Sequence, residues 1–278
     1  MTSRTLATNL CFGEGPRWHG DKLWFSDMHD HWVKTMTPDG QVENVVEVKA
    51  RPSGLGWLPD GSLLIVSMSD RRLLRYDGGK VAEHADLSQL AAFDCNDMVV
   101  DANGRAYVGS FGFDLHNRAE FRAAGLICVE ADGTARSVAE EIGFPNGTVI
   151  TPDSRTLVVA ESFARKLTAF TIAPNGDLGE RRVWAELEGG ISPDGICLDE
   201  AGGIWVASPP TQECVRVVEG GEVTHRVEVD RGAFACMLGR GPVLYILTSS
   251  SSNPSKCREQ RSARIEVAPA PHPGAGWP

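Results

Sequence analysis

Six short apolar segments recur along the chain and are typical of the buried strands of a repeated β structure. Each follows, after about ten positions, a short loop that carries a small or polar residue. Successive segments lie roughly 40 to 50 residues apart, which is the length of one propeller blade. The segments are Leu-Trp-Phe at 23–25, Leu-Leu-Ile at 63–65, Ala-Tyr-Val at 106–108, Leu-Val-Val at 157–159, Ile-Trp-Val at 204–206 and Leu-Tyr-Ile at 244–246.

Turn residues divide each repeat further. Asp, Asn and Gly precede the apolar segments, as in Pro-Asp-Gly at 59–61, and a β-branched strand and a further turn follow. This alternation of strands and turns is typical of four-stranded antiparallel blades. The sequence therefore predicts an all-β fold, a six-bladed β-propeller around a central channel, with units near 13–45, 52–90, 96–138, 144–186, 192–230 and 232–250.

The last unit is short, so another segment must complete the ring. Either the N-terminal residues 3–9 or the late strand 263–267 is expected to do so. We expect one propeller domain over 1–278, with 268–278 as a loose C-terminal tail rich in Pro, Gly and Ala. Only 86–93 and 117–124 have helix-like patterns, and Lys34 is expected on an outer strand where its replacement is silent.

The composition agrees with this fold class and argues against some classes of binding partner. The 30 glycines and 16 prolines fall between short apolar runs, as in a chain with many tight turns. A net charge of −10 argues against nucleic acid or an anionic membrane as a partner. Seven scattered cysteines without a Cys-x-x-Cys pair are interpreted as buried hydrophobes in a reducing compartment. With no signal core at the N-terminus, we expect a cytoplasmic protein, a monomer or small homo-oligomer.

The loops before the strands carry the candidate chemistry. Equivalent positions in a closed ring point at one axis, so Glu14, Asn96, Asn146 and Asp194 are expected to meet there. The oxygen atoms of such residues suit Ca²⁺, Mg²⁺ or Mn²⁺, with Zn²⁺ less favoured. Three protein ligands would leave coordination positions for water or substrate, as in a catalytic site. The alternative is that these are turn residues that bond their own backbone.

Motifs for other chemistries are missing from the sequence. It contains no Gly-x-Ser-x-Gly elbow, phosphate loop, dinucleotide fingerprint or His-Glu-x-x-His motif. Covalent catalysis is therefore not expected, and a metal with bound water is the simpler hypothesis.

The same loops resemble a known family. Gly13-Glu14-Gly15-Pro16-Arg17-Trp18, Asn96-Asp97, Pro145-Asn146-Gly147 and the stretch from Pro193 to Asp199 are similar to the gluconolactonase, regucalcin and luciferin-regenerating-enzyme family of six-bladed propellers. The resemblance implies one divalent cation, Ca²⁺ before Mn²⁺, Mg²⁺ or Zn²⁺, held by Glu14, Asn146 and Asp194. It also implies hydrolysis of a small lactone or ester, with Asn96 contacting substrate. The cation would polarise the lactone carbonyl, and Asp194 would act as base or proton shuttle.

The chain departs from the sugar-lactone branch of that family at the expected substrate contacts. Asp94 stands where the branch carries an Arg, and Phe113 stands where an acidic residue is expected, with Asp114 adjacent. These three are the further candidates for substrate binding. Several aromatic residues lie close to the site loops, which makes an apolar lactone or ester an alternative to a sugar lactone: Phe12, Phe111, Phe113, Phe144 and Phe163. A phosphotriester hydrolase and a non-catalytic calcium-binding propeller are the alternative functions.

Overall fold

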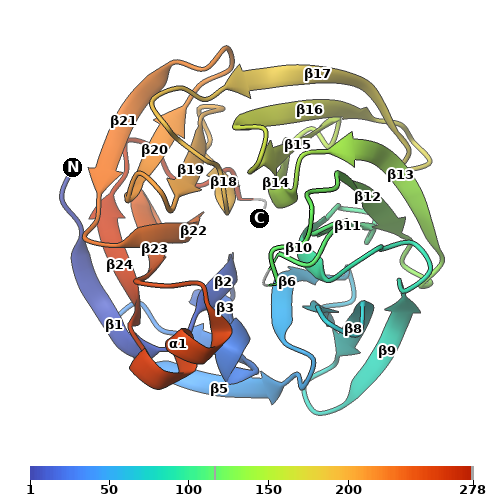
Figure 1. Cartoon of the computed structure of the whole chain (residues 1–278), viewed down its shortest axis with the longest axis horizontal. Coiled ribbons are helices and arrows are strands. Elements are labelled where there is room, and N and C mark those ends of the chain that lie inside the picture. The colour runs from blue at the N-terminus through green and yellow to red at the C-terminus, as the bar shows by residue number, and fades with distance from the viewer. Residues whose placement is uncertain (116, 277–278) are drawn as a thin grey trace.

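The strands form a closed ring of six blades around a central channel, as the sequence predicts (Figure 1). The structure is a computed structural model, and it describes residues 1–115 and 117–276. Within these residues every blade is a four-stranded antiparallel sheet, and one edge strand of each sheet lines the channel.

The first three blades follow the chain from the channel outward. The first holds β2 (Gly13–His19), β3 (Lys22–Asp27), β4 (Trp32–Met36) and β5 (Val42–Glu47). The second holds β6 (Pro52–Trp57), β7 (Leu63–Ser67), β8 (Arg72–Tyr76) and β9 (Val81–Asp86). The third holds β10 (Cys95–Val100), β11 (Ala106–Ser110), β12 (Ala124–Val129) and β13 (Ala135–Ile142).

The fourth and fifth blades repeat this order. The fourth holds β14 (Pro145–Ile150), β15 (Thr156–Glu161), β16 (Lys166–Ile172) and β17 (Leu178–Glu186). The fifth holds β18 (Ile196–Leu198), β19 (Ile204–Ser208), β20 (Glu213–Val217) and β21 (Val223–Glu228).

Both ends of the chain complete the last blade. It combines β22 (Gly232–Leu238), β23 (Val243–Ser249) and β24 (Ala263–Pro269) with the N-terminal β1 (Arg4–Leu10), which pairs with β24 at the outer edge. The sequence predicts one closing segment or the other, and the structure uses both. Opening the ring must therefore break the backbone hydrogen bonds between β1 and β24.

Helical structure differs from the sequence prediction. Residues 86–93 continue from the end of β9 into turns, in which the amides of Leu90 and Ala91 both donate to the Leu87 carbonyl. Residues 117–123 are irregular, and β12 begins at Ala124. The α-helix of the described chain is α1 (Pro254–Gln260), capped by Asn253, and a short 3₁₀ helix, η1 (Met28–Asp30), follows β3. Neither helix is long and apolar enough to cross a membrane.

Neighbouring inner strands approach one another through glycines. A Cβ added to Gly54 would lie 2.4 Å from the amide nitrogen of Met98 in the next blade, and one added to Gly147 would lie 2.4 Å from that of Ile196. These positions therefore have no room for a side chain, and the six inner strands can close into a narrow ring. Larger apolar residues fill the space between the blades farther from the axis.

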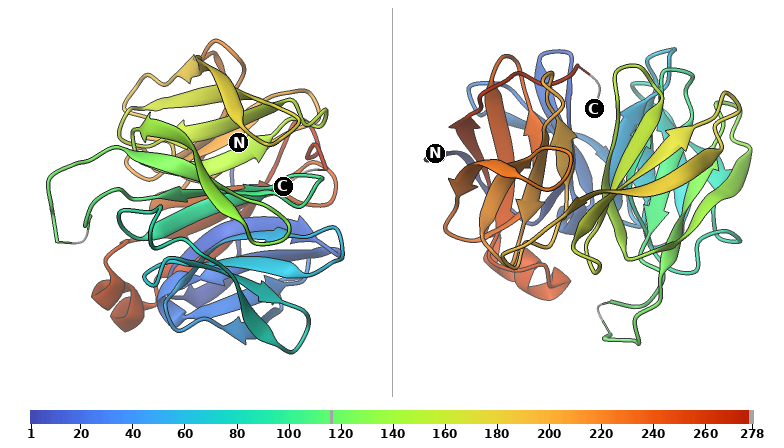
Figure 2. Two further views of the ribbon diagram at one scale, coloured as in Figure 1. Left: turned by 90° about the vertical axis from the view of Figure 1, so that its right-hand side faces the viewer. Right: turned by 90° about the horizontal axis from the view of Figure 1, so that it is seen from above.

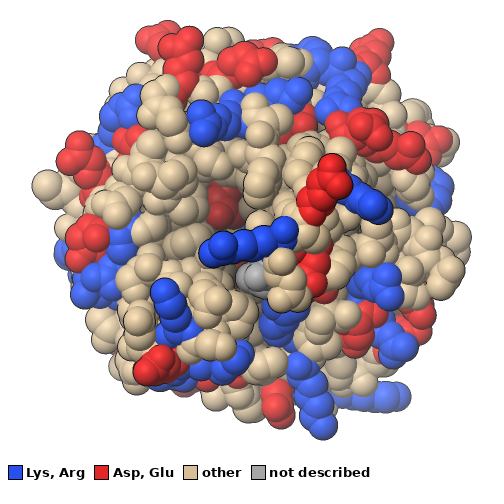
Figure 3. Space-filling view, in the orientation of Figure 1, with Lys and Arg blue, Asp and Glu red and all other residues tan. Residues whose placement is uncertain are grey.

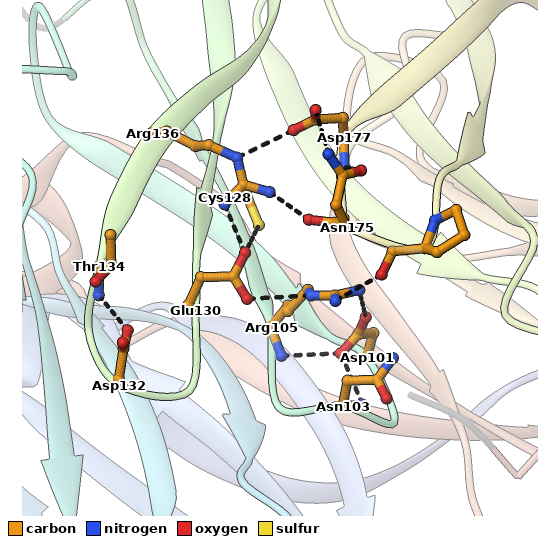
Figure 4. A network of polar contacts seen from close by, with 12 residues as sticks. Asp101, Asn103, Arg105, Cys128, Glu130, Asp132, Thr134, Arg136, Asn175 and Asp177 are labelled. Atoms are coloured by element: carbon orange, nitrogen blue, oxygen red, sulfur yellow. Dashed lines mark hydrogen bonds and ion pairs between the residues drawn. The ribbon is translucent and has the colours of Figure 1, made fainter.

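A polar network joins turns of the third blade to the turn between β16 and β17 of the fourth (Figure 4). Arg105 donates to Glu130 (Nε–Oε2, 3.1 Å) in its own blade and to the Pro174 carbonyl (2.7 Å) in the next. Arg136 in the same way bridges Glu130 and Asp177. These contacts connect the two blades that supply Asn96 and Asn146.

Two further expectations are wrong. Lys34 is buried on β4, the third strand of its blade, and its ammonium pairs with Asp27 (2.8 Å) and Asp30 (2.6 Å). The C-terminal segment is not loose over 268–276. Its first two residues belong to β24, and the Pro273 carbonyl and the Ala275 amide bond to the Glu200 amide and the Leu198 carbonyl. All seven cysteines are buried and free, as expected.

The two ends of the channel differ. Residues 111–115 and 117–123, which we call the loop 111–123, project with α1 from one end, whereas the C-terminal segment lies at the other (Figure 2). A cavity of about 460 Å³ opens at the end with the C-terminal segment. Its lining includes residues at the far ends of the inner strands, such as His19, Trp57 and Leu238, together with Gly274.

Candidate functional site

The four loop residues that the sequence singles out all lie at one end of the channel. Glu14, Asn96 and Asn146 are the second residues of inner strands β2, β10 and β14, and Asp194 lies two residues before β18. The starts of the inner strands share the end from which α1 and the loop 111–123 project. We call this end the mouth. Figure 3 shows a hollow near the middle of this face, with acidic side chains visible inside it.

Hydrogen bonds connect three neighbouring blades at the mouth. The Asn96 side chain donates to the Pro145 carbonyl (Nδ2–O, 3.2 Å), so the third blade is joined to the fourth directly beside Asn146. The Asn146 side chain donates to Ser162 (Nδ2–Oγ, 3.2 Å), and that hydroxyl donates to the Pro193 carbonyl (2.6 Å). The Gly147 amide donates to the Asp194 carbonyl (3.1 Å). Hydrogen bonds therefore connect the predicted residues of the third, fourth and fifth blades to one another.

The carboxylates at the mouth repel one another. Burial raises the pKa of Glu14 well above its usual range, and the charges of Asp194 and Asp97 raise it further. Burial also raises the pKa of Asp194 to about 8. A hydrogen bond from Asn146 lowers this pKa in part, and the charge of Asp97 raises it. Both side chains are only partly exposed, whereas Asn96 and Asn146 are buried. The structure thus brings Glu14, Asn146 and Asp194 close enough to interact.

Asp97 and Arg17 belong to the same group, although the sequence reasoning did not single them out. Arg17 reaches from β2 to pair with Asp97 (Nη2–Oδ1, 3.0 Å), and both side chains are buried. Burial raises the pKa of Asp97 in spite of that partner. Arg17 lowers the pKa of Glu14 less than the two acids raise it. Arg17 therefore offsets only part of the repulsion among the three acids.

A signal for Asp97 was present in the repeats. The residue after the candidate position is glycine in four of the six blades, at Gly15, Gly54, Gly147 and Gly195, but it is Asp97 in the third. An acidic residue at a position where the close approach of backbones favours glycine is a departure that could have been noticed.

The donor set fits a hard divalent cation. Two carboxylates and one amide offer oxygen atoms without a thiolate or an imidazole, which suits Ca²⁺, Mg²⁺ or Mn²⁺. A cation would neutralise the negative charge that Glu14 and Asp194 carry when ionised, and so remove the repulsion that raises the pKa of Glu14. Among the described residues, no three His, Cys, Asp or Glu side chains group as a metal site. A cation at the mouth would therefore depend on the Asn146 amide as well as on the two acids.

The other residues expected at the substrate have protein partners. The Asp94 carboxylate pairs with Arg51 of the preceding blade, and its own carbonyl accepts from the Phe111 amide (2.9 Å). Asp114 accepts from the amide (3.1 Å) and the side chain (2.7 Å) of Asn117. Phe113 is buried among other phenylalanine rings. The structure thus places Asp94 and Asp114 in contacts that orient the loops around the mouth.

Known proteins resemble this chain in sequence and in fold. Residues 12–250 match the family described as the SMP-30/Gluconolactonase/LRE-like region. A pentonolactonase of Haloferax volcanii is 29% identical over 212 residues, which cover 74% of this chain and 69% of the relative. A gluconolactonase of Xanthomonas campestris has a similar structure, with a TM-score of 0.77 at 22% identity, covering 96% of this chain and 89% of the other.

A calcium-binding protein, regucalcin, of Agrobacterium tumefaciens shares the fold with a TM-score of 0.78 at 19% identity, covering 99% of this chain and 97% of the other. At these identities the two solved structures bear on the fold alone. The family match extends over the blades that carry Glu14, Asn96, Asn146 and Asp194. This chain therefore belongs to the SMP-30/gluconolactonase/LRE-like family.

Proposed function

We propose that this protein is a lactone hydrolase that depends on a divalent cation and opens a small cyclic ester to a hydroxy acid. The observation that carries the proposal is the group formed by Glu14, Asn146 and Asp194 at the mouth, in which the Asp194 charge raises the pKa of Glu14 and Asn146 is hydrogen-bonded to Asp194. The family match and the relative named pentonolactonase support the reaction class, and the oxygen donors of the group support the cation.

Glu14, Asn146 and Asp194 are the residues that would hold the cation. When bound, it would supply a positive charge that polarises the lactone carbonyl and stabilises the oxyanion formed on attack. A nearby cation also favours the ionised form of Asp194, whose pKa is about 8 in the metal-free protein. The carboxylate is then available as a base near neutral pH.

Asp194 is proposed to move the proton. Its carboxylate takes a proton from water as the water oxygen forms a bond to the carbonyl carbon. When the ring C–O bond breaks, the same group returns the proton to the leaving oxygen, and a hydroxy acid results. A positioned acid or base of this kind supplies about 10²–10⁴-fold in rate. Asn96 is proposed to contact the substrate, because its side chain lies at the mouth beside the fourth blade.

A hydrolysis assay with a pH indicator tests the proposal. Metal-stripped protein is given γ-butyrolactone, gluconolactone, an aromatic lactone and a phosphotriester, alone and after addition of Ca²⁺, Mn²⁺, Mg²⁺ or Zn²⁺. We expect the protein to hydrolyse one or more of these lactones only after a cation is added. Faster turnover of the phosphotriester than of every lactone would change the reaction class. Cation binding, seen as a rise in Tm, without turnover of any ester would indicate a binding protein instead.

A further inference from the structure

Five phenylalanines of the third and fourth blades form one connected cluster beside the mouth. Ring centroids lie 4.7 Å apart for Phe111 and Phe144, 5.0 Å for Phe144 and Phe163, and 5.5 Å for Phe121 and Phe163. Phe113 contacts Phe121, Phe144 and Phe163. We call these residues the phenylalanine cluster. Such contacts are usual in a protein interior, but this cluster continues to the surface.

Two of the five rings are exposed. Phe121 is 47% exposed and Phe163 is 52% exposed, and their rings stack at an interplanar angle of 21°. Phe121 lies on the irregular loop 111–123, which projects from the mouth (Figure 2). Long loops without regular structure in a compact domain are often functional, and grouped exposed apolar side chains mark binding surfaces.

The cluster is continuous with the proposed catalytic site. Phe163 follows Ser162, whose hydroxyl accepts from the Asn146 side chain. Phe144 precedes Pro145, whose carbonyl accepts from the Asn96 side chain. The Ser162 amide donates to the Phe144 carbonyl (3.2 Å). The segments that carry Phe144 and Phe163 therefore border the place where a molecule would bind at Asn96 and Asn146.

Polar side chains near the cluster do not favour a heavily hydroxylated substrate. The acids expected to bind sugar hydroxyls, Asp94 and Asp114, already accept hydrogen bonds from Arg51 and Asn117. A molecule with an apolar substituent suits these surroundings better than a sugar lactone.

We propose that the substrate is a lactone with an alkyl or aryl substituent on its ring, and that the substituent packs against Phe121 and Phe163. This inference rests on the proposed lactone hydrolysis and adds the class of lactone. Each methylene that leaves water on these rings should raise kcat/KM about fourfold. The rise should end where the chain extends beyond the cluster.

The test is kcat/KM for a series of γ-lactones, from butyrolactone through hexalactone and octalactone to decalactone, with the cation that supports turnover. The ratio of octalactone to butyrolactone should be high in the wild type. It should fall roughly tenfold in Phe121→Ser and in Phe163→Ser, because about two methylenes lose their contacts. Val183→Ser removes a side chain of similar exposure, 48%, from the outer strand β17 and should leave the ratio unchanged.

Three results would overturn the inference. A flat series in the wild type, or gluconolactone as the best substrate, would show that the cluster does not bind the substrate. A ratio that is unchanged in both phenylalanine variants would place the substituent elsewhere. Hydrolysis of no lactone at all would instead refute the proposed function, and the two failures are thereby distinguishable.

Discussion

Gly147 lies where two inner strands meet beside Asp194, so Gly147→Ala is a direct test of the packing at the mouth. A Cβ at this position would lie 2.4 Å from the Ile196 nitrogen and 2.7 Å from the Asp194 carbonyl oxygen. Both are backbone atoms, so the fifth blade must move as a unit to make room. Overpacking of this kind costs about 1–3 kcal/mol of unfolding free energy.

The same substitution should also weaken cation binding. The Gly147 amide donates to the Asp194 carbonyl at 3.1 Å, and a shift of the fifth blade would move Asp194 away from Asn146. Urea unfolding of the metal-free protein measures the first effect, and the rise in Tm on addition of Ca²⁺ measures the second.

Gly79→Ala is the matched control. Gly79 lies in the turn before β9, no atom lies within 4 Å of its added Cβ, and its backbone angle allows an ordinary residue. This variant should be as stable as the wild type or more stable by about 0.4–1 kcal/mol, because alanine restricts the unfolded chain. If Gly147→Ala matches Gly79→Ala in both stability and cation response, the account of the mouth is wrong.

Three further predictions concern the charged groups. Glu14→Gln and Asp194→Asn should each abolish lactone hydrolysis and the rise in Tm with Ca²⁺; circular dichroism checks the fold, and an active variant would contradict the metal-site assignment. Because the folded pKa of Asp194, about 8, is above its ordinary value of 3.8, the metal-free folded state holds this proton more tightly than the unfolded state. The free energy of unfolding should therefore fall as pH rises between these two values, and it should fall less in Asp194→Asn. The midpoint of urea unfolding measures this at each pH. An equal dependence of the midpoint on pH in the two proteins would contradict the prediction. Lys34→Met should cost about 3–5 kcal/mol in urea unfolding by leaving Asp27 buried without its cation, whereas Lys22→Met, at an exposed pair, should cost less than about 1 kcal/mol. Equal stability of the two lysine variants would show that the Lys34 pair is not needed.

The ring and the position of the candidate residues could be predicted because they follow from a repeat. Once loops and strands recur at the spacing of a blade, closure places Glu14, Asn96, Asn146 and Asp194 at the same end of the channel. For this prediction it is enough to know where each inner strand begins. The pairing of β1 with β24 could not be predicted from the sequence, because the pattern at either end of the chain suits a strand that completes the last blade.

Contacts between blades could not be predicted from local patterns. Lys34 looks like a surface residue of an alternating strand, but Asp27 and Asp30 fold over it and bury its ammonium. Asp97 and Arg17 are 80 residues apart in sequence and meet only because the first and third blades face one channel. The phenylalanine cluster likewise depends on how an irregular loop folds beside the next blade. A periodic pattern of apolar residues carries no information about such a contact.

The most direct test of the proposed cation site is to locate a cation in a crystal of this protein soaked with Mn²⁺, which takes oxygen ligands and scatters anomalously. We expect an anomalous peak at the mouth, coordinated by oxygen atoms of Glu14, Asn146 and Asp194, and no such peak in crystals of Asp194→Asn. A well-occupied peak bound elsewhere, or a peak at the mouth that persists without the Asp194 carboxylate, would contradict it.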